Sequence, residues 1–282
     1  MIADQKDFIT PHITDSHTLD YPCLHSGFVC EYELPHWNPI HIGRFALDIS
    51  PTRHVVMLWI AALLCIITTL LALRAHNRRT REGRAPGGFG NGLEALVLYL
   101  RNEVVLPNVG PHGNGYLPFL LTLFFFILFA NLLGLVPYGS TATGNISVTA
   151  TLAIVTFIVI ELAGMKAQGK AYINTIIFWP HDMSLGMKLF ISPILTPIEL
   201  IGKFTKPFAL AIRLFANMTA GHIVLLALIS LIFTFGSWFL VPVPILMGVA
   251  ISVLELFVAF LQAYIFTLLS SVFIGLIREG AH

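Results

Sequence analysis

Charged residues are scarce in this sequence, and their scarcity excludes an ordinary soluble protein. Only 11% of the 282 residues are Asp, Glu, Lys or Arg, whereas 56% are hydrophobic and the mean hydropathy is +0.81. So few charges do not cover the surface of a soluble globule. Only helices or closed barrels span a bilayer, and barrel strands alternate polar and apolar residues over short segments. The long uncharged runs therefore predict an all-α integral membrane protein.

Other absences exclude further classes of function. Three cysteines are too few for a metal or disulfide framework, and the net charge of +1 comes without a basic patch interleaved with aromatic residues. No phosphate-binding glycine loop, nucleophile elbow or metalloprotease helix is present. The sequence therefore predicts no metal, no cofactor, no nucleotide site and no nucleic-acid partner.

Residues 1–50 are expected to form an external, polar, acidic N-terminal tail. They hold seven acidic and two basic residues. A cleavable signal peptide is not expected, because the start of the chain lacks a basic segment followed by an apolar run. Cys23 and Cys30 either form a disulfide in an oxidising compartment or stay free. The tail histidines match no metal-ligand spacing and are interpreted as solvated. These histidines are His12, His17, His25, His36 and His41.

Five apolar segments are long enough to cross a bilayer, and they divide the rest of the chain into three regions. Residues 93–106 mix apolar and charged residues, which is typical of an interfacial amphipathic helix. Basic residues follow the first and third crossings and favour the cytoplasmic side, so the N-terminus is expected outside and the C-terminus inside. The regions are 51–116, 117–188 and 189–282, and the expected crossings are 55–73, 117–136, 147–163, 189–240 and 245–277.

The last two crossings predict a long, strongly tilted helical hairpin. Residues 245–277 would form a helix about 50 Å long, whereas the hydrocarbon core is about 30 Å thick. Such a helix tilts by about 50°, kinks or projects into water. Residues 207–240 have nearly the same length, and Pro242 with Pro244 is expected to separate the two helices.

Six polar side chains in these two helices are candidate site residues, because an ionisable group inside a membrane is costly and is a functional hypothesis by default. Arg213 has no acid within one helical turn. An antiparallel hairpin with its midpoint near residue 238 or 239 brings His222 close to Glu255, and Arg213 close to Gln262. The six residues are Glu199, Arg213, Asn217, His222, Glu255 and Gln262.

The arrangement suggests two polar routes that do not join. One passes His222 and Glu255, the other passes Glu199, and the permanent charge of Arg213 separates them. Histidine and glutamate can relay protons, whereas a guanidinium stays protonated. Arg213 would block a direct leak and attract a carboxylate from a second subunit.

Structural interpretations of the same side chains remain open. Arg213 could pair with Glu255, and His222 could be a hydrogen-bonded packing residue. Glu199 could form an interfacial ion pair with Lys203 or Lys206 at helical spacing.

The two amides and one further acid also have structural interpretations. Asn217 and Gln262 could simply join helices, as amides often do in bilayers. Glu161 lies near a span end beside Lys166 and is interpreted as an interfacial acid.

The segment KPFALAIRLFANMTAGH (residues 206–222) resembles subunit a of the F-type ATP synthase, the stator channel protein of its membrane sector. Glu199 before it and LQAYIF (residues 261–266) after it extend the resemblance, which covers at least residues 193–277. FANLLGLVPY (residues 129–138) is similar to the more variable front half of that family. The acidic tail lies outside the resemblance.

The resemblance implies roles for the candidate residues. Arg213 matches the arginine that faces the ring of c subunits and keeps two aqueous half-channels from short-circuiting, and Gln262 matches a glutamine packed close to it. His222 and Glu255 would line the outer half-channel, with the histidine and the acid exchanged relative to enterobacterial members. Asn217 matches a channel-lining position, and Glu199 matches an acid associated with proton exit.

The implied function is a non-catalytic, proton-translocating subunit of a rotary ATP synthase. A proton enters past His222 and Glu255, rides on a c-subunit carboxylate around the ring, and leaves past Glu199. The implied partners are the c-subunit ring, peripheral-stalk b subunits, other ATP synthase subunits and the lipid bilayer. A bacterial inner membrane is the expected location, and an organellar energy-transducing membrane is the other.

Two other function classes compete with this interpretation. A proton-coupled secondary transporter would show an internal repeat with broken helices, and no second copy of the RLFANMTAGH segment is present. A structural scaffold would have little reason to keep Arg213, His222 and Glu255 at intramembrane positions.

Overall fold

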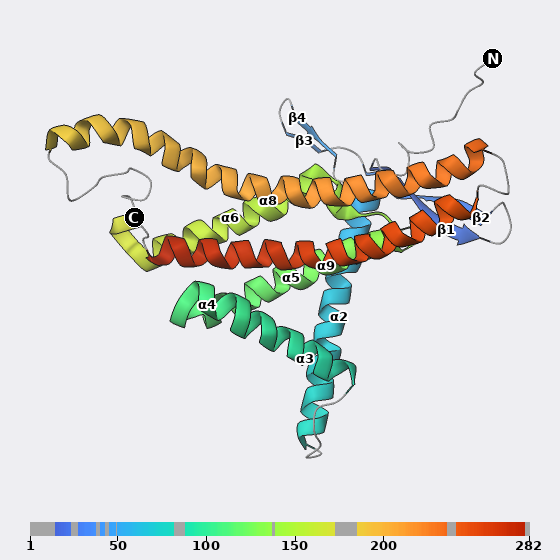
Figure 1. The fold of residues 1–282 in the computed structure, drawn as a ribbon, viewed down its shortest axis with the longest axis horizontal. Helices are drawn as coiled ribbons and strands as arrows, with labels where there is room; N and C mark the ends of the chain where they lie inside the picture. Colours follow the sequence, from blue (N-terminus) through green and yellow to red (C-terminus); the bar gives the residue numbers. More distant parts are fainter. Residues whose placement is uncertain are drawn as a thin grey trace. The chain divides into compact units, whose positions relative to one another are not determined.

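The computed structural model describes residues 15–23, 28–37, 40–42, 45–48, 50–81, 88–136, 139–172, 185–235 and 241–279. Long helices dominate these residues and can be followed in chain order in Figure 1. Among them, five helical segments are long and apolar enough to cross a membrane, which confirms the all-α membrane fold. These segments are Arg53–Arg74, Gly90–Leu135, Ile146–Gln168, Phe190–Leu231 and Pro242–Arg278.

The chain forms two compact units, each assembled from segments that are far apart in sequence. The first unit contains residues 1–71, 125–148 and 214–263. The second contains residues 72–124, 149–213 and 264–282. Both units therefore take part of the last two helices.

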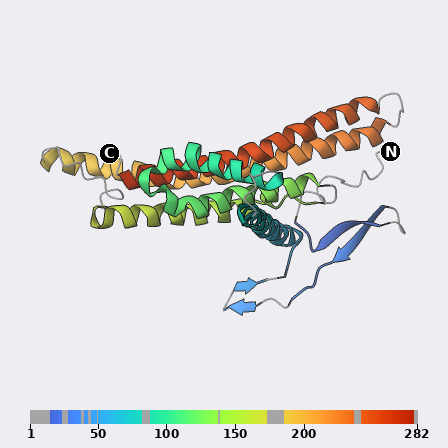
Figure 2. The same ribbon diagram turned by 90° about the horizontal axis from the view of Figure 1, so that it is seen from below.

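The N-terminal segment of the first unit carries two antiparallel strand pairs, shown as blue arrows in Figure 2. Thr18 lies opposite Glu33 in the first pair, and Ile40 opposite Leu47 in the second. These strands were not predicted from the sequence, which indicated only a polar tail, because strands of three to six residues carry little periodicity. The strands are β1 (Thr18–Cys23), β2 (Phe28–Glu33), β3 (Ile40–Ile42) and β4 (Phe45–Leu47).

The cysteines also divide between the tail and the first crossing. Cys30 in β2 is disulfide-bonded, which decides between the two alternatives that the sequence left open for it. Cys65 is free. It lies in the first long helix and is partly buried there.

Helix α2 (Arg53–Arg81) is the first predicted crossing, extended at both ends. Its run of apolar residues contains two threonines, and each hydroxyl donates a hydrogen bond to the backbone one turn earlier. Thr68 bonds to the carbonyl of Leu64 and Thr69 to that of Cys65, both at 2.7 Å. These bonds satisfy the hydroxyls inside the helix, so they need no water in the hydrocarbon region.

In the second unit a bent helical segment precedes the second crossing. Gly110 has φ of 75° and turns the chain between α4 and α5, a backbone conformation that favours glycine. The segment confirms helical structure over residues 93–106, and its position at a membrane interface stays a prediction. The elements are α3 (Phe89–Tyr99), the π-helical turn η1 (Leu100–Val105), α4 (Leu106–Val109), the 3₁₀ turn η2 (Gly110–His112) and α5 (Gly113–Leu135).

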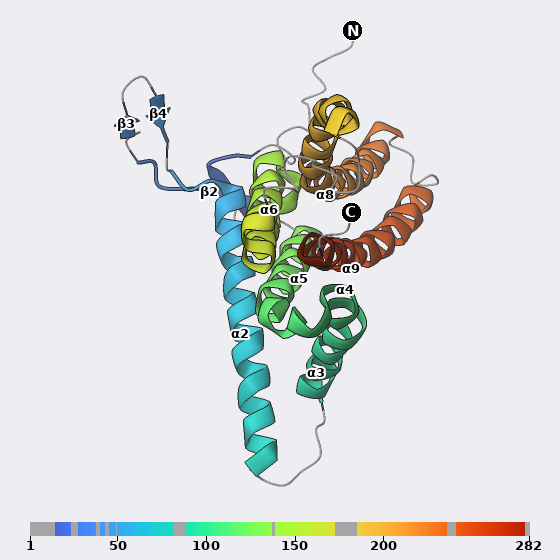
Figure 3. The ribbon, with the colours of Figure 1, turned by 90° about the vertical axis from the view of Figure 1, so that its left-hand side faces the viewer.

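The apolar core of the second unit joins four helices around α4 and the end of the chain. Gly275 packs so closely on α4 that an added Cβ would lie 1.9 Å from the carbonyl oxygen of Asn108. Figure 3 shows α4 beside the C-terminal part of α9. The buried members of this core are Val105, Val109, Leu120, Ile160, Ala163 and Ile274.

Helix α6 (Ile146–Gln168) is the third crossing, and a side-chain cap begins it. The backbone N–H of Ser147 donates to Oδ1 of Asn145 at 2.9 Å, so one of the unpaired donors at the helix start is satisfied. The short 3₁₀ turns η3 (Ala142–Gly144) and η4 (Gly169–Tyr172) flank this helix.

Helices α8 (Leu185–Phe235) and α9 (Pro242–Glu279) form the long antiparallel hairpin that the sequence predicted. They rise about 76 Å and about 57 Å at 1.5 Å per residue, and Figure 1 shows them side by side. Pro242 begins α9 and Pro244 lies in its first turn, so the prolines mark the boundary between the two helices, as expected. A first-turn residue needs no helical N–H bond, and proline fits there. The tilt stays a prediction.

Candidate functional site

In the first unit, α8 and α9 meet through a pair of amides. Nδ2 of Asn217 donates a hydrogen bond to Oε1 of Gln262 at 3.1 Å. Gln262 is only 1% exposed, and its Nε2 has no hydrogen-bond partner in the described structure. The amides join the helices, as the structural interpretation held. A buried donor nevertheless remains available at Gln262.

Glu255 of α9 is buried against a glycine of α8. An added Cβ at Gly221 would lie only 2.0 Å from Oε1 of Glu255, so the carboxylate fills the space that the missing side chain leaves. Glu255 is 8% exposed, and its Oε2 is buried without a hydrogen-bond partner in the described structure. The hairpin register thus brings Glu255 to the residue directly before His222, close to the predicted pairing.

His222 itself is half-buried and is hydrogen-bonded outside the hairpin. Its Nε2 pairs with the hydroxyl of Thr141, which lies in the connection between α5 and α6. Thr141 was not among the predicted site residues, because only polar residues inside the crossings stand out in the sequence. Thr141 stands between two crossings.

A second layer of polar residues supports this connection. Thr143 donates to Oδ1 of Asn131 at 2.7 Å, and Nδ2 of Asn131 donates to the carbonyl of Ala259 on α9 at 3.3 Å. Thr143 and Asn131 are 0% and 1% exposed. Asn131 is an amide inside the second crossing, and that signal alone could have made it a candidate.

Arg213 belongs to the second unit and is exposed on α8. Within the described part of that unit, no acid forms an ion pair with its guanidinium. Large apolar side chains of the same helix are exposed on the stretch before it. These are Ile201 (64%), Phe204 (57%), Phe208 (66%) and Ile212 (38%).

Glu199 is half-buried on α8, and the two lysines nearest to it along the helix contact other groups. Nζ of Lys203 lies 3.5 Å from Oε2 of Glu161 and 3.3 Å from the hydroxyl of Tyr172. Nζ of Lys206 lies 5.2 Å from the ring centre of Phe273 on α9.

For two acids, Glu199 and Glu161, these contacts differ from the ones that their sequence spacing indicated. In the described structure neither lysine is ion-paired with Glu199, so its interpretation as an interfacial ion pair gains no support. Glu161 pairs with Lys203 on α8, although its sequence neighbourhood had pointed to Lys166.

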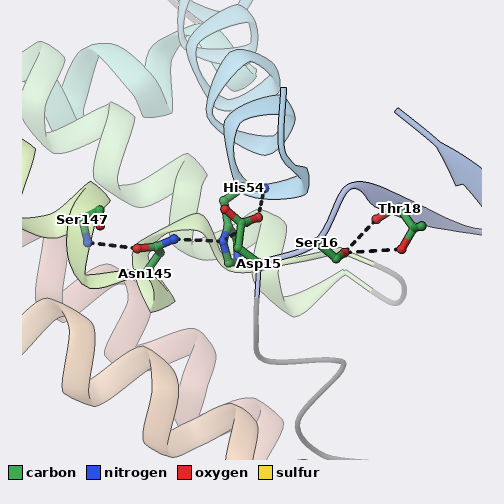
Figure 4. A network of polar contacts seen from close by, with 6 residues as sticks. All are labelled: Asp15, Ser16, Thr18, His54, Asn145 and Ser147. Carbon is green, nitrogen blue, oxygen red and sulfur yellow. Dashed lines mark hydrogen bonds and ion pairs between the residues drawn. The ribbon is translucent and has the colours of Figure 1, made fainter. Parts of the chain in front are cut away.

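A separate polar network ties the N-terminal segment to the first unit (Figure 4). Nδ1 of His54 lies 3.1 Å from Oδ1 of Asp15 and 3.3 Å from Nδ2 of Asn145. The backbone N–H of His54 also donates to Oδ1 of Asp15 at 3.2 Å, which caps the first turn of α2. Burial raises the pKa of Asp15. The hydrogen bond and charge of His54, with a hydrogen bond from Thr52, outweigh burial and leave this pKa below its ordinary value of 3.8.

No group of three or more His, Cys, Asp or Glu residues that could hold a metal ion occurs among the described residues. In the tail, the rings of His17 and His36 contact each other with their centres 4.5 Å apart. His12 and His25 lie outside the described residues.

The site geometry therefore separates into two parts. The first unit gathers an acid, an imidazole and two amides where α8, α9 and the α5–α6 connection meet. The second unit carries an exposed arginine and an acid without an ion-pair partner in its described part. Acid and imidazole side chains on membrane-length helices can accept and release protons.

Comparison with known proteins matches nearly the whole chain. The family described as ATP synthase A chain matches residues 55–275. ATP synthase subunit a 2 of Chlorobaculum tepidum is 47% identical, over 97% of this chain and 74% of its own length. ATP synthase subunit a of Chloroherpeton thalassium is 46% identical (94% and 74% covered), and that of Anaeromyxobacter dehalogenans is 42% identical (95% and 70% covered).

Proposed function

Because this chain belongs to the ATP synthase A chain family, we propose that it is the stator subunit of the F-type ATP synthase membrane sector. It provides two offset half-channels through which protons pass to and from the ring of c subunits. This flow drives rotation of the ring and thereby ATP synthesis. The subunit moves protons and performs no nucleotide chemistry itself.

The observation that carries the proposal is the polar pairing inside the hairpin of α8 and α9. Glu255 packs on Gly221 next to His222, and Asn217 bonds to Gln262. The side chains thus form a row about two turns long on helices that are long and apolar enough to cross a membrane. His222 and Glu255 receive protons from the outer side and pass them to a c-subunit carboxylate.

Arg213 is the barrier between the half-channels. It lies nine residues before His222, about 13 Å along α8, and its charge persists at every physiological pH. A membrane potential of 100 mV is worth about 2.3 kcal/mol per elementary charge, which a continuous path would dissipate. A permanent positive charge opposes such a path and attracts the ionised c-subunit carboxylate.

Glu199 is the exit group. In the described structure its neighbours Lys203 and Lys206 contact Glu161, Tyr172 and Phe273. Its carboxylate therefore remains available for proton exchange. Protons released near Arg213 leave past Glu199 on the cytoplasmic side.

An exposed apolar surface suggests one of the partners. The exposed apolar side chains on the stretch of α8 before Arg213 suit contact with the c-subunit ring. Peripheral-stalk b subunits and other ATP synthase subunits hold the stator in place. The subunit lies in a bacterial inner membrane, with the N-terminal tail outside and the C-terminus in the cytoplasm. A proton-coupled secondary transporter, the alternative function, gains no support from the family match.

The first test is ATP-driven acidification of inverted vesicles that carry the whole complex. We expect Arg213→Ala to abolish coupled pumping while the complex still assembles, because the barrier and the carboxylate partner are lost together. Arg101→Ala removes an arginine outside the hairpin, where Nε bonds to Asn114, and serves as the control. Gln262→Leu should lower the rate to an intermediate value. Pumping near the wild-type rate by Arg213→Ala would contradict the proposal, and passive leak is recorded on stripped membranes.

A further inference from the structure

We propose that Thr141 is a positioning residue for proton transfer, because its hydroxyl holds the imidazole of His222 whether or not Nε2 carries a proton. The inference rests on the function proposed above. It gives the α5–α6 connection a part in the outer half-channel through a residue that touches no proton-carrying carboxylate.

The position of Thr141 is fixed by its backbone as well as by its side chain. Its hydroxyl bonds to Nε2 of His222, and its carbonyl accepts a hydrogen bond from the backbone N–H of Gly144 at 2.8 Å. Only 5% of Thr141 is exposed. The Thr141 hydroxyl therefore contacts α8 from a hydrogen-bonded turn over residues 141–144.

Helix α5 packs directly against Thr141 through a glycine. An added Cβ at Gly134 would lie 1.7 Å from Oγ1 and 2.7 Å from Cβ of Thr141. Such distances leave no room for any side chain at residue 134. The Thr141 side chain therefore lies directly against the backbone of α5 at Gly134, which restricts its rotation.

A second bond ties the same connection to α8. The hydroxyl of Thr219 donates to the carbonyl of Gly144 at 3.4 Å. Thr219 and His222 are three residues apart, so both lie on the same face of the helix. Together these contacts fix His222 relative to the α5–α6 connection.

A hydroxyl suits this place because it both donates and accepts hydrogen bonds. When Nε2 lacks a proton, it accepts a bond from the Thr141 hydroxyl. When Nε2 carries a proton, it donates to Oγ1. A carbonyl or an ammonium group serves only one of these states. The imidazole ring therefore keeps its orientation as it gains and loses a proton. Nδ1 is then the ring nitrogen that exchanges protons with the outer half-channel.

The titratable group that faces this site from α9 is Glu255, against Gly221. Asn131 of α5 and Thr143 of the α5–α6 connection are neutral and bond to each other. A pH profile of pumping therefore reports on His222 and Glu255 together.

The test compares Thr141→Val, which keeps the shape but lacks the hydroxyl, with Thr141→Ser, which keeps the hydroxyl. We expect Thr141→Val to lower the initial rate of ATP-driven acidification about fivefold, the usual scale for one hydrogen bond. It should also change the pH profile of the rate. Thr141→Ser should recover most of the wild-type rate. Immunoblots confirm equal amounts of the subunit in the membranes.

A double-mutant cycle with His222→Ala shows whether Thr141 acts through the imidazole. If it does, Thr141→Val adds no further loss in the His222→Ala background. Wild-type pumping by Thr141→Val, equal losses in the Ser and Val variants, or an additive loss in the double variant would each overturn the proposal. If His222→Ala alone pumps normally, no role through His222 survives. The Arg213→Ala result decides the stator function separately.

Discussion

At the scale of single residues, Gly221 determines where the Glu255 carboxylate lies. A helix of a membrane protein gains nothing in stability from an interior glycine unless a neighbour fills the space. Here Oε1 of Glu255 occupies that space, at 2.0 Å from the position of an added Cβ. A glycine without chemistry of its own therefore positions the acid beside His222.

The variant Gly221→Ala tests this placement. We expect the methyl group to push the Glu255 carboxylate away, and ATP-driven acidification to fall at least severalfold. Gly248→Ala, on the neighbouring helix α9 with nothing within 4 Å of the added Cβ, is the matched control. It should pump like the wild type. Equal rates in the two variants would show that the carboxylate position does not matter.

The polar candidates could be read from the sequence because charges inside crossings are rare and stand out. Thr141 and Gly221 could not. A threonine between crossings is unremarkable, and the importance of a glycine depends on the side chain opposite it. Asn217 was a candidate, but its bond to Gln262 was not predicted. That bond depends on how α8 and α9 are rotated relative to each other, and the spacing of residues along one helix does not give this rotation.

At the scale of elements, η1 and α4 pack closely against α9 in the second unit. The carbonyl of Val104 accepts hydrogen bonds from Nδ2 of Asn108 at 2.6 Å and from the hydroxyl of Ser271 at 3.4 Å. The backbone of α4 can approach α9 this closely only because residue 275 is glycine.

We therefore expect Gly275→Ala to separate α4 from α9. Overpacking of this kind typically costs about 1–3 kcal/mol, so the assembled complex should lose activity at a lower temperature than the wild type. Gly248→Ala on the same helix has open space around the added Cβ and should leave the inactivation temperature unchanged. A thermal inactivation series on purified complex measures both.

The ion pair between Glu161 of α6 and Lys203 of α8 is a second contact between elements. Its side chains are 19% and 15% exposed, so removing one partner leaves the other charge largely buried. Glu161→Gln should lower the inactivation temperature, and the double variant Glu161→Gln with Lys203→Met should recover most of the loss. If the double variant is no better than the single one, the pair does not stabilise the unit.

The crossings were predictable because runs of about 20 apolar residues have few alternatives in a bilayer. The register of the hairpin was also predictable, because a midpoint near residue 238 or 239 places Glu255 opposite the stretch of α8 that holds Gly221 and His222. The tail strands and the bend at Gly110 were not predicted. Short strands lack periodicity, and a single glycine in an apolar segment gives no sign of its φ.

At the scale of the whole molecule, the first unit joins the start of the chain to its later crossings. Asp15 precedes the strands, His54 begins α2, and Asn145 caps α6, yet the three side chains meet in one network. Sequence reasoning could not anticipate this, because contacts between distant, weakly patterned segments follow from tertiary structure alone.

Replacing Asp15 with Asn should loosen the attachment of the tail. We expect amide hydrogen exchange to rise about fivefold over residues 15–18, as for loss of one partly exposed hydrogen bond to a charged group. The pKa of Asp15 lies below 3.8, so the wild-type attachment is fully present above that pH and is lost as the pH falls through the lowered pKa. Asp15→Asn should lack this acid transition. Identical exchange in both proteins would exclude a role for Asp15.

The network around His54 also has a consequence for biogenesis. Because the chain is synthesised from its N-terminus, Asn145 leaves the ribosome some 90 residues after His54. The bond between Asn145 and His54 can therefore form only after the connection between the second and third crossings has been synthesised, whereas the Asp15–His54 pair needs no later segment. Formation of the Asn145–His54 bond is therefore a late step of membrane insertion. Protease resistance of the tail, measured in a series of truncated nascent chains, would show at which chain length the tail becomes attached.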